Sequence, residues 1–227
     1  MIKNIIFDLD NTIIKTEDSD SIYYKDALKN CGYDENKYLD LYNAIDIYDF
    51  NITENNPYYD KKELLKTINT YMKTNYSIKL IDELINVIGK YWTKKVIIKE
   101  EIIKKLSEKY NLYVFTNFFT EAQKKRLENI GYLKYFKKIF GADEYGSKVF
   151  KSSIEKVLKE LNVSPNECVM IGDDKSRDIL CANFVGMKSI LYDYNGKRDK
   201  KEYNLKNYIL INNMDNLEKV INDLELR

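Results

Sequence analysis

The chain has 227 residues, and its 37 lysines and arginines nearly balance its 36 aspartates and glutamates, which argues against a generic polyanion-binding protein. It contains no histidine, so Ser-His and Cys-His nucleophile pairs and histidine-bound metals are excluded. The three cysteines are far apart, and no stretch approaches the roughly 18 apolar residues of a membrane span. We therefore expect a cytoplasmic protein, either a monomer or a homodimer, that binds neither nucleic acid nor membranes.

The first predicted element is a short buried strand over Ile5–Phe7, followed at once by Asp8 and Asp10. Alternation along an extended chain directs both carboxylates to the same side, at the end of a strand where open α/β sheets bind ligands. Two like charges held this close need a divalent cation, a proton or a strongly polar environment. The pair indicates chemistry or metal binding; the competing interpretation is that two aspartates merely end a strand.

A helical insertion is predicted next, because the following strand-like run starts about 100 residues later, far more than one crossover helix needs. Amphipathic patterns predict four helices there, over Ile22–Asn30, Asn36–Ile47, Lys61–Lys73 and Ile78–Tyr91. Asn55-Asn56-Pro57 predicts a loop between two of them. We therefore expect a core over residues 1–15 and 95–227 and an inserted helical domain over residues 16–94, with polar hinges near Lys15–Asp20 and Thr93–Val96.

The rest of the chain alternates apolar runs with helical segments, as in a parallel sheet with crossover helices. Further strands are predicted over Leu112–Phe115, Lys138–Phe140, Cys168–Ile171, Ser189–Leu191 and Tyr208–Ile211. The helices predicted between and after them cover Glu100–Tyr110, Thr120–Ile130, Ser152–Leu161, Ser176–Phe184 and Asn216–Leu224. Thr120 and Gln123 have the spacing of a capping box, and Gly131 is expected to stop that helix. The predicted fold class is therefore α/β, with a doubly wound parallel sheet.

Three more polar clusters fall at predicted strand ends. Thr116 and Asn117 follow the second strand, although both residue types are also common in turns. Asp173, Asp174 and Asp178 follow the fourth strand and form a candidate cation site, with a solvated helix start as the alternative. Lys148 and Lys151 lie near the loop that enters the helix before that strand, where a lysine is by default a surface residue.

Together these residues resemble the four signature motifs of the haloacid dehalogenase superfamily, a large group of phosphohydrolases that use an aspartate nucleophile. Phe7-Asp8-Leu9-Asp10-Asn11-Thr12 is similar to the first motif, Phe115-Thr116-Asn117 to the second, and Gly172-Asp173-Asp174 with Asp178 to the fourth. The third motif needs a lysine, and counting back from Asp173 indicates Lys148. Lys151 is a rival, because the proline that commonly follows the motif lysine is Val149 here.

The resemblance implies a Rossmann-like core with an inserted α-helical cap, in agreement with the predicted insertion. It implies that Asp8 attacks phosphorus to give an aspartyl-phosphate, and that Asp10 protonates the leaving oxygen and later deprotonates the attacking water. Thr116 and the Asn117 backbone N–H would hold phosphoryl oxygens. Lys148 would offset developing charge and help to hold Asp8 ionised.

The resemblance also implies a Mg²⁺ cofactor, bound by Asp8, the main-chain carbonyl of Asp10 and Asp173. Asp174 and Asp178 would support the metal site. Cleavage of a phosphate ester needs an acid at the leaving oxygen, whereas carbon–halogen displacement does not, so Asp10 argues against a dehalogenase. It also argues against a phosphonatase-like member of the superfamily, since these lack that aspartate.

The substrate is less well defined. The segment Phe118–Leu127, with Thr120, Gln123 and Arg126, resembles the nucleotidase branch, and phosphoglycolate phosphatase-like enzymes are a close second. We expect a Mg²⁺-dependent phosphatase acting on a small phosphorylated metabolite, such as a nucleoside monophosphate. A sugar-phosphate mutase, which keeps the Asp-x-Asp pair, and a non-catalytic phosphate-binding or regulatory domain are the alternatives.

Overall fold

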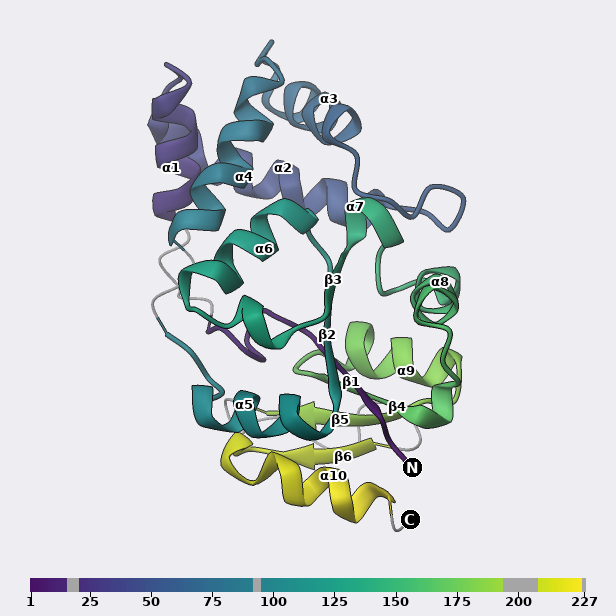
Figure 1. Ribbon diagram of the computed structural model, residues 1–227. Coiled ribbons are helices and arrows are strands. Elements are labelled where there is room, and N and C mark those ends of the chain that lie inside the picture. Colours follow the sequence, from purple (N-terminus) through teal and green to yellow (C-terminus); the bar gives the residue numbers. More distant parts are fainter. Residues whose placement is uncertain (16–20, 92–94, 194–207, 226–227) are drawn as a thin grey trace.

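The computed structural model describes residues 1–15, 21–91, 95–193 and 208–225, and in these ranges it shows a parallel six-stranded sheet flanked by helices, with four further helices beyond one end of the sheet (Figure 1). The strand order is β3-β2-β1-β4-β5-β6, so the predicted doubly wound fold is confirmed. The strands are β1 (Asn4–Phe7), β2 (Asn111–Thr116), β3 (Lys138–Gly141), β4 (Cys168–Gly172), β5 (Lys188–Tyr192) and β6 (Tyr208–Ile211).

The first strand lies at the point where the strand order reverses. Phe7 is in register with Val114 of β2 on one side and with Ile171 of β4 on the other. The pairing with β4 continues past the strand, since the Asp8 backbone N–H donates to the Ile171 carbonyl over 2.8 Å. This reversal opens the crevice in which doubly wound sheets bind ligands, and Asp8 stands at its edge.

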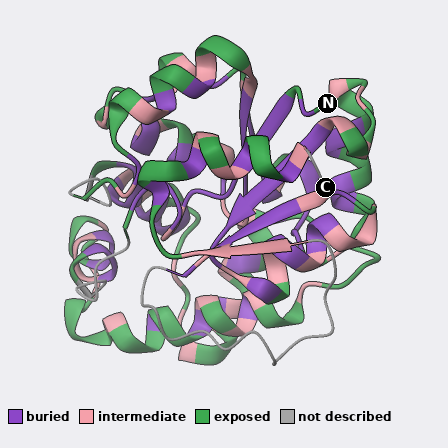
Figure 2. Ribbon diagram, turned by 90° about the horizontal axis from the view of Figure 1, so that it is seen from below, coloured by how far each residue is buried: buried purple, intermediate pink, exposed green. Residues whose placement is uncertain are grey.

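Alternating side chains of the sheet build two hydrophobic layers. Ile5 packs in one layer with Ile103 of α5 (Glu100–Lys109) and Ile221 of α10 (Leu217–Glu225). Ile6 points into the other layer, with Val157 of α8 (Lys151–Leu161) and with α9 (Leu180–Phe184). The central strands are buried on both faces (Figure 2). Each fully buried aliphatic side chain contributes about 2 kcal/mol, so these layers fix the strands that carry the polar rim.

The first four α-helices after β1 form the inserted cap. They are α1 (Ser21–Asn30), α2 (Tyr38–Asn51), α3 (Lys61–Met72) and α4 (Lys79–Tyr91). They share a hydrophobic cluster of their own, which extends to Phe119 and Ala122 beside and on α6 (Thr120–Asn129) and to Ala142 on the short helix α7 (Ala142–Tyr145). The cap therefore packs directly on the core.

The two connections to the cap run next to each other where they leave the core. The Lys15 N–H donates to the Lys95 carbonyl, and the Ile97 N–H donates to the Ile13 carbonyl, each over 2.8 Å. Most of the predicted hinge residues, 16–20 and 93–94, lie outside the described ranges. The partition into residues 1–15 and 95–227 against 16–94 therefore stays a prediction.

A cap loop is docked on the core near the polar rim. It follows α2 and carries the predicted turn at Pro57. The Ser147 N–H donates to the Pro57 carbonyl over 2.8 Å, and the Tyr59 N–H donates to the Ala142 carbonyl over 3.1 Å. The Tyr59 ring meets Phe119 edge-on at 5.9 Å between centroids. This loop ties the cap to the core segment that carries Lys148.

One local prediction is wrong, and one predicted helix is confirmed but has an unexpected first turn. Thr120 is not the capping residue of α6; Phe119 is, and the Thr120 hydroxyl and N–H both donate to Asp143 instead, which leaves Gln123 available for other contacts. The helix predicted over Ser176–Phe184 begins as a π-helix over Lys175–Ile179 and only then becomes α9. Apolar periodicity gives no sign of this wider first turn, which is a feature frequent at functional sites.

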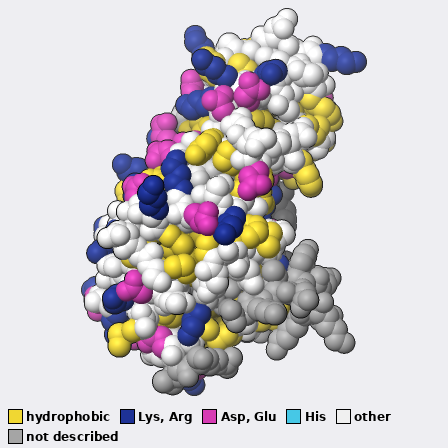
Figure 3. Space-filling model, turned by 90° about the vertical axis from the view of Figure 1, so that its right-hand side faces the viewer, with side chains coloured by type: hydrophobic (Ala, Val, Ile, Leu, Met, Phe, Trp, Pro, Cys, Tyr) yellow, Lys and Arg dark blue, Asp and Glu magenta, His cyan; other side chains and the backbone are white. Residues whose placement is uncertain are grey.

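The surface agrees with the balanced composition. On the face shown in Figure 3, lysine and arginine side chains are interspersed with aspartate and glutamate. Among the helices that the structure describes, none combines the length and the apolar character needed to cross a bilayer.

Candidate active site

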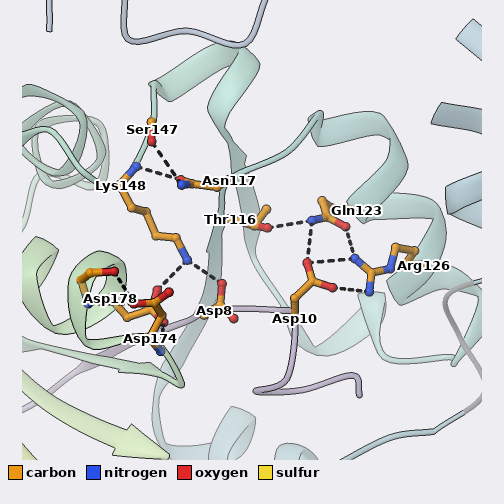
Figure 4. A network of polar contacts seen from close by, with 11 residues as sticks. Asp8, Asp10, Thr116, Asn117, Gln123, Arg126, Ser147, Lys148, Asp174 and Asp178 are labelled. Carbon is orange, nitrogen blue, oxygen red and sulfur yellow. Dashed lines mark hydrogen bonds and ion pairs between the residues drawn. The ribbon is translucent and has the colours of Figure 1, made fainter. Parts of the chain in front are cut away.

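The predicted carboxylate pair lies at the end of β1. Asp8 is buried, with 5% of its surface exposed, and Asp10 is more open. The chain turns back at once: Asn11 has a left-handed φ of 55°, and the N–H groups of Ile13 and Ile14 both donate to the Leu9 carbonyl over 3.0 Å. This tight turn leaves the two carboxylates at the rim of the crevice, pointing to different partners (Figure 4).

Lys148 bridges two buried carboxylates. Its Nζ donates to Asp8 Oδ1 over 2.5 Å and to Asp178 Oδ1 over 2.6 Å. Its backbone N–H donates to the side-chain oxygen of Asn117. The side-chain NH₂ group of Asn117 donates to the Ser147 hydroxyl oxygen over 3.1 Å. Lys151 starts α8 instead and pairs with Glu155 on an exposed helix face. The geometry thus brings Lys148, and not Lys151, to Asp8.

A glycine and the π-helix together place Asp178 at the end of β4. A side chain at Gly172 would put its Cβ 2.1 Å from Asp178 Oδ2, so only glycine leaves room for this carboxylate. Asp178 also accepts the Asp174 N–H over 3.0 Å. The Asp174 side chain in turn accepts the N–H of Ser176 and its hydroxyl, each over 2.7 Å, which fixes the start of the π-helix. The two predicted supporting aspartates are therefore parts of one rigid turn.

The acidic cluster fits a hard divalent cation. Oxygens of Asp8, Asp173 and Asp178 lie within 4.8 Å of one another, and no softer donor is part of this group. Carboxylate oxygens are the ligands that Mg²⁺ prefers. Both oxygens of Asp178 already accept hydrogen bonds, from Lys148 and Asp174, whereas Lys148 uses only one oxygen of Asp8. Asp178 therefore has less room for a cation than Asp8, and it holds Lys148 in place.

Burial and charge determine the protonation of this cluster. Burial raises the pKa of Asp8 to about 7; the attraction of Lys148 opposes this rise, and the charges of Asp178 and Asp10 add to it. Burial alone would lower the pKa of Lys148, but Asp178 and Asp8 outweigh burial and raise it. Lys148 thus remains a cation, and a second cation near Asp8 would favour its ionised, nucleophilic form.

Asp10 is held by two residues of α6 that sequence reasoning did not place in the site. Arg126, which is completely buried, donates to both Asp10 oxygens, over 2.6 and 3.1 Å. Gln123 lies next to this pair: it accepts from Arg126 over 2.5 Å and donates to Thr116 Oγ1 over 2.7 Å and to Asp10 over 3.3 Å. One network therefore joins Asp10 to Thr116 (Figure 4).

A signal for these two residues does exist in the sequence. The buried stripe of α6 consists of Ala122, Gln123, Arg126 and Leu127. Two polar side chains thus occupy positions that a helix facing the core normally fills with apolar ones. Buried charges need partners. The resemblance of this segment to the nucleotidase branch included both residues but gave them no role.

The site residues surround a small cavity. It measures about 200 Å³, and its lining includes all the predicted site residues, Asp8, Asp10, Thr116, Asn117, Lys148, Asp173, Asp174 and Asp178, as well as Arg177. Five carboxylates and two cations line it, and a third cation, Arg126, pairs with Asp10 from outside the lining. A bound metal cation would neutralise part of this negative charge beside a phosphoryl group.

Comparison with known proteins identifies the class. A family model described as haloacid dehalogenase-like hydrolase matches residues 5–192, and the chain belongs to this family. The fold agrees: the structure of the HAD-hydrolase YfnB from Bacillus subtilis, determined with bound magnesium, superposes with a TM-score of 0.73 at 17% identity over 97% of this chain and 99% of that one.

Particular relatives are phosphatases. The chain is 25% identical to a glyceraldehyde 3-phosphate phosphatase of Methanothermobacter thermautotrophicus, over 97% of this chain and 100% of the relative. It is 27% identical to the enzyme of the same name from Pyrococcus furiosus, over 91% and 87%. A ribulose-1,5-bisphosphate 5-phosphatase of Halopiger xanaduensis matches at 30% identity, but only over 45% of this chain and 44% of that one. The chain is thus a haloacid dehalogenase-like hydrolase, and these relatives are named as phosphatases.

Proposed function

We propose that this protein is a Mg²⁺-dependent phosphatase of small phosphorylated metabolites and that it acts through an aspartyl-phosphate on Asp8. The observation that carries the proposal is the contact of Lys148 with Asp8 and Asp178, over 2.5 and 2.6 Å, at the strand reversal of the sheet. It holds a buried carboxylate in one orientation, with one oxygen bound by Lys148, at the edge of a cavity where a phosphoryl group would lie.

Asp8, Asp10 and Thr116 would each have a separate role in the reaction. The Asp8 oxygen that Lys148 does not contact would form the bond to phosphorus as the ester oxygen leaves with the bonding electron pair. Asp10 would supply a proton to that oxygen and take one from water when the aspartyl-phosphate is hydrolysed. The Thr116 hydroxyl, whose oxygen accepts from Gln123, can donate its own hydrogen to a phosphoryl oxygen.

Asp8, Asp173 and the Asp10 main-chain carbonyl would hold the Mg²⁺, with Asp174 and Asp178 in support. When bound, the ion would neutralise the clustered carboxylates and polarise the phosphoryl oxygens. Lys148 would remain charged throughout and offset the charge that develops on phosphorus.

Among small phosphorylated metabolites, we place short sugar phosphates ahead of nucleoside monophosphates. The full-length matches named glyceraldehyde 3-phosphate phosphatase support this order, while the resemblance of α6 to the nucleotidase branch covers only ten residues or so. A cytoplasmic location belongs to the same proposal and agrees with three free cysteines.

The test is phosphate release from glyceraldehyde 3-phosphate, phosphoglycolate and nucleoside monophosphates, with Mg²⁺ and with chelator. We expect release that needs Mg²⁺, is abolished by Asp8→Asn, and persists in Lys151→Ala, which removes an exposed lysine of the same region. Release that survives Asp8→Asn, with contamination excluded, would refute the role of Asp8. Transfer of the phosphoryl group to a second sugar hydroxyl, without free phosphate, would indicate a mutase instead.

A further inference from the structure

A second cavity adjoins the phosphoryl site at the contact between cap and core. It measures about 400 Å³ and shares two lining residues, Asn117 and Arg177, with the site cavity. The site cavity itself is only about half as large and is occupied by charged groups. A substrate whose phosphoryl group lies in the site cavity, beside Asp8 and Lys148, therefore has the adjoining cavity as the space for the rest of the molecule.

The charged groups of this second cavity neutralise each other. Its only charged lining residues among those that the structure describes are Asp49, near the end of α2, and Arg177, in the π-helix. Arg177 donates to Asp49 Oδ2 over 2.7 Å. Asp49 also accepts the hydroxyl of Tyr59, which is buried against Tyr48 and Phe119.

The Asp49–Arg177 pair is thus built into the cap–core contact. Because the Tyr59 loop is itself tied to the core by backbone hydrogen bonds, the Asp49 carboxylate is held in place before substrate arrives. Only the Arg177 side chain remains substantially exposed, at 41%, against 20% for Asp49.

The rest of the lining is neutral. Asn117, Ser147 and Ser176 offer amide and hydroxyl groups, which suit sugar hydroxyls and carbonyls. The apolar part consists of Phe50, Ile52, Val149 and Phe150, and Phe50 is 90% exposed at the outer edge. The lining therefore combines hydrogen-bonding groups with hydrocarbon but offers no uncompensated charge to a second anionic group.

We infer that this cavity binds the leaving-group half of the substrate and selects an uncharged, short, hydroxylated chain over one that bears a carboxylate or a second phosphate. This inference rests on the proposed phosphatase function and specifies its substrate class. An anionic leaving group would have to take Arg177 from Asp49 and would leave that carboxylate, next to its own charge, without its cation.

The test compares two phosphomonoesters with the same three-carbon chain, glycerol 3-phosphate and 3-phosphoglycerate, which differ in a hydroxymethyl group against a carboxylate. Values of kcat/KM are measured with Mg²⁺ for wild type, Asp49→Asn, Arg177→Gln and the double variant. Asp46→Asn, the same change at an exposed position of α2, is the matched control.

Wild type should prefer glycerol 3-phosphate. Asp49→Asn should shift the ratio of kcat/KM values towards 3-phosphoglycerate by about tenfold or more, because Arg177 then pairs with the substrate carboxylate. Arg177→Gln should shift the ratio the other way, and the double variant should return it close to the wild-type value. Asp46→Asn should leave it unchanged.

A wild-type preference for 3-phosphoglycerate, or a ratio that neither single variant moves, would overturn the assignment. The opposite signs expected for the two single variants, with reversal in the double variant, separate selection from simple damage to the cap, which would lower both kcat/KM values together. If wild type released no phosphate from either ester or from p-nitrophenyl phosphate, the proposed function itself would fail.

Discussion

Replacing Asp8 by asparagine should abolish turnover and at the same time stabilise the metal-free protein. The pKa of Asp8 rises from its ordinary value of 3.8 to about 7 in the fold, mainly because the carboxyl is buried, so ionising it costs folding free energy. At 1.36 kcal/mol per pH unit, this rise corresponds to about 4 kcal/mol. Asparagine has nearly the same shape and does not ionise, and it therefore escapes this cost.

The stability difference between Asp8→Asn and wild type depends on pH, because the pKa of Asp8 is higher in the folded protein than in the unfolded chain. With a carboxyl of raised pKa, the folded wild-type protein loses stability as the pH climbs from 3.8 towards about 7. The variant should therefore exceed wild type by about 2 kcal/mol at pH 5 and by about 4 kcal/mol at pH 8 in chelator. For a chain of this length, the larger difference raises Tm by about 10 °C.

The assay is urea unfolding at both pH values, with chelator and with Mg²⁺. Mg²⁺ at a hundred times its Kd should add about 2.7 kcal/mol to the free energy of unfolding of wild type and much less to that of the variant. The stability difference between the two proteins should therefore narrow. Asp82→Asn, an exposed carboxylate on α4, is the control and should change stability by less than about 0.5 kcal/mol. An Asp8→Asn protein less stable than wild type at pH 8 in chelator would show that the contact with Lys148 outweighs burial, and would refute the reasoning.

Three further outcomes follow from the site geometry. Gly172→Ala should push Asp178 away from Lys148, since the new Cβ would lie 2.1 Å from Asp178 Oδ2, and should cost about 1–3 kcal/mol in urea unfolding and at least about tenfold in kcat; an unchanged kcat would contradict this. Lys148→Ala should lower the free energy of unfolding by about 3 kcal/mol and abolish turnover, whereas Lys151→Ala should change both little; the reverse ranking would mean that the register of the third motif is wrong. Arg126→Met should lower kcat/KM for an alkyl phosphate about a hundredfold but kcat/KM for p-nitrophenyl phosphate much less, because nitrophenolate leaves without a proton; equal losses of kcat/KM for the two substrates would indicate a purely structural role.

The sequence predicts the sheet well because burial dominates there. Short apolar runs such as Cys168–Ile171 are recognisable without any long-range information, and all six predicted strands are confirmed within about two residues at each end. The strand ends then bring Asp8, Thr116 and Asp173 to one rim as a matter of topology. The long interval between the first two strands likewise predicts a helical insertion.

The contacts of Asp10 could not be predicted, because they depend on whether Thr120 and Gln123 form a capping box at the start of α6 or bind other residues. The spacing of Thr120 and Gln123 fits a capping box, but Asp143, far along the chain, binds Thr120 instead. Gln123 is then directed to Thr116 and Arg126. A tertiary contact overrides the local pattern, and no sequence rule gives its strength.

The pairing of Asp49 with Arg177 is unpredictable for a different reason. The two residues are 128 positions apart, in the cap and in the core, and each is one of many charged residues on an amphipathic helix or turn. Their meeting depends on how the cap docks, which follows from the packing of Tyr59 on Phe119. The apolar pattern of the sequence likewise gives no sign of the π-helix that carries Arg177.

The central claim is that Asp8 carries the phosphoryl group during turnover. The most direct measurement is mass spectrometry of the peptide that contains Asp8, after rapid acid quench of the enzyme turning over p-nitrophenyl phosphate with Mg²⁺. We expect one added phosphoryl group on Asp8 in wild type and none in Asp8→Asn. Sustained turnover with an unmodified Asp8, or a phosphoryl group on another residue, would contradict the claim.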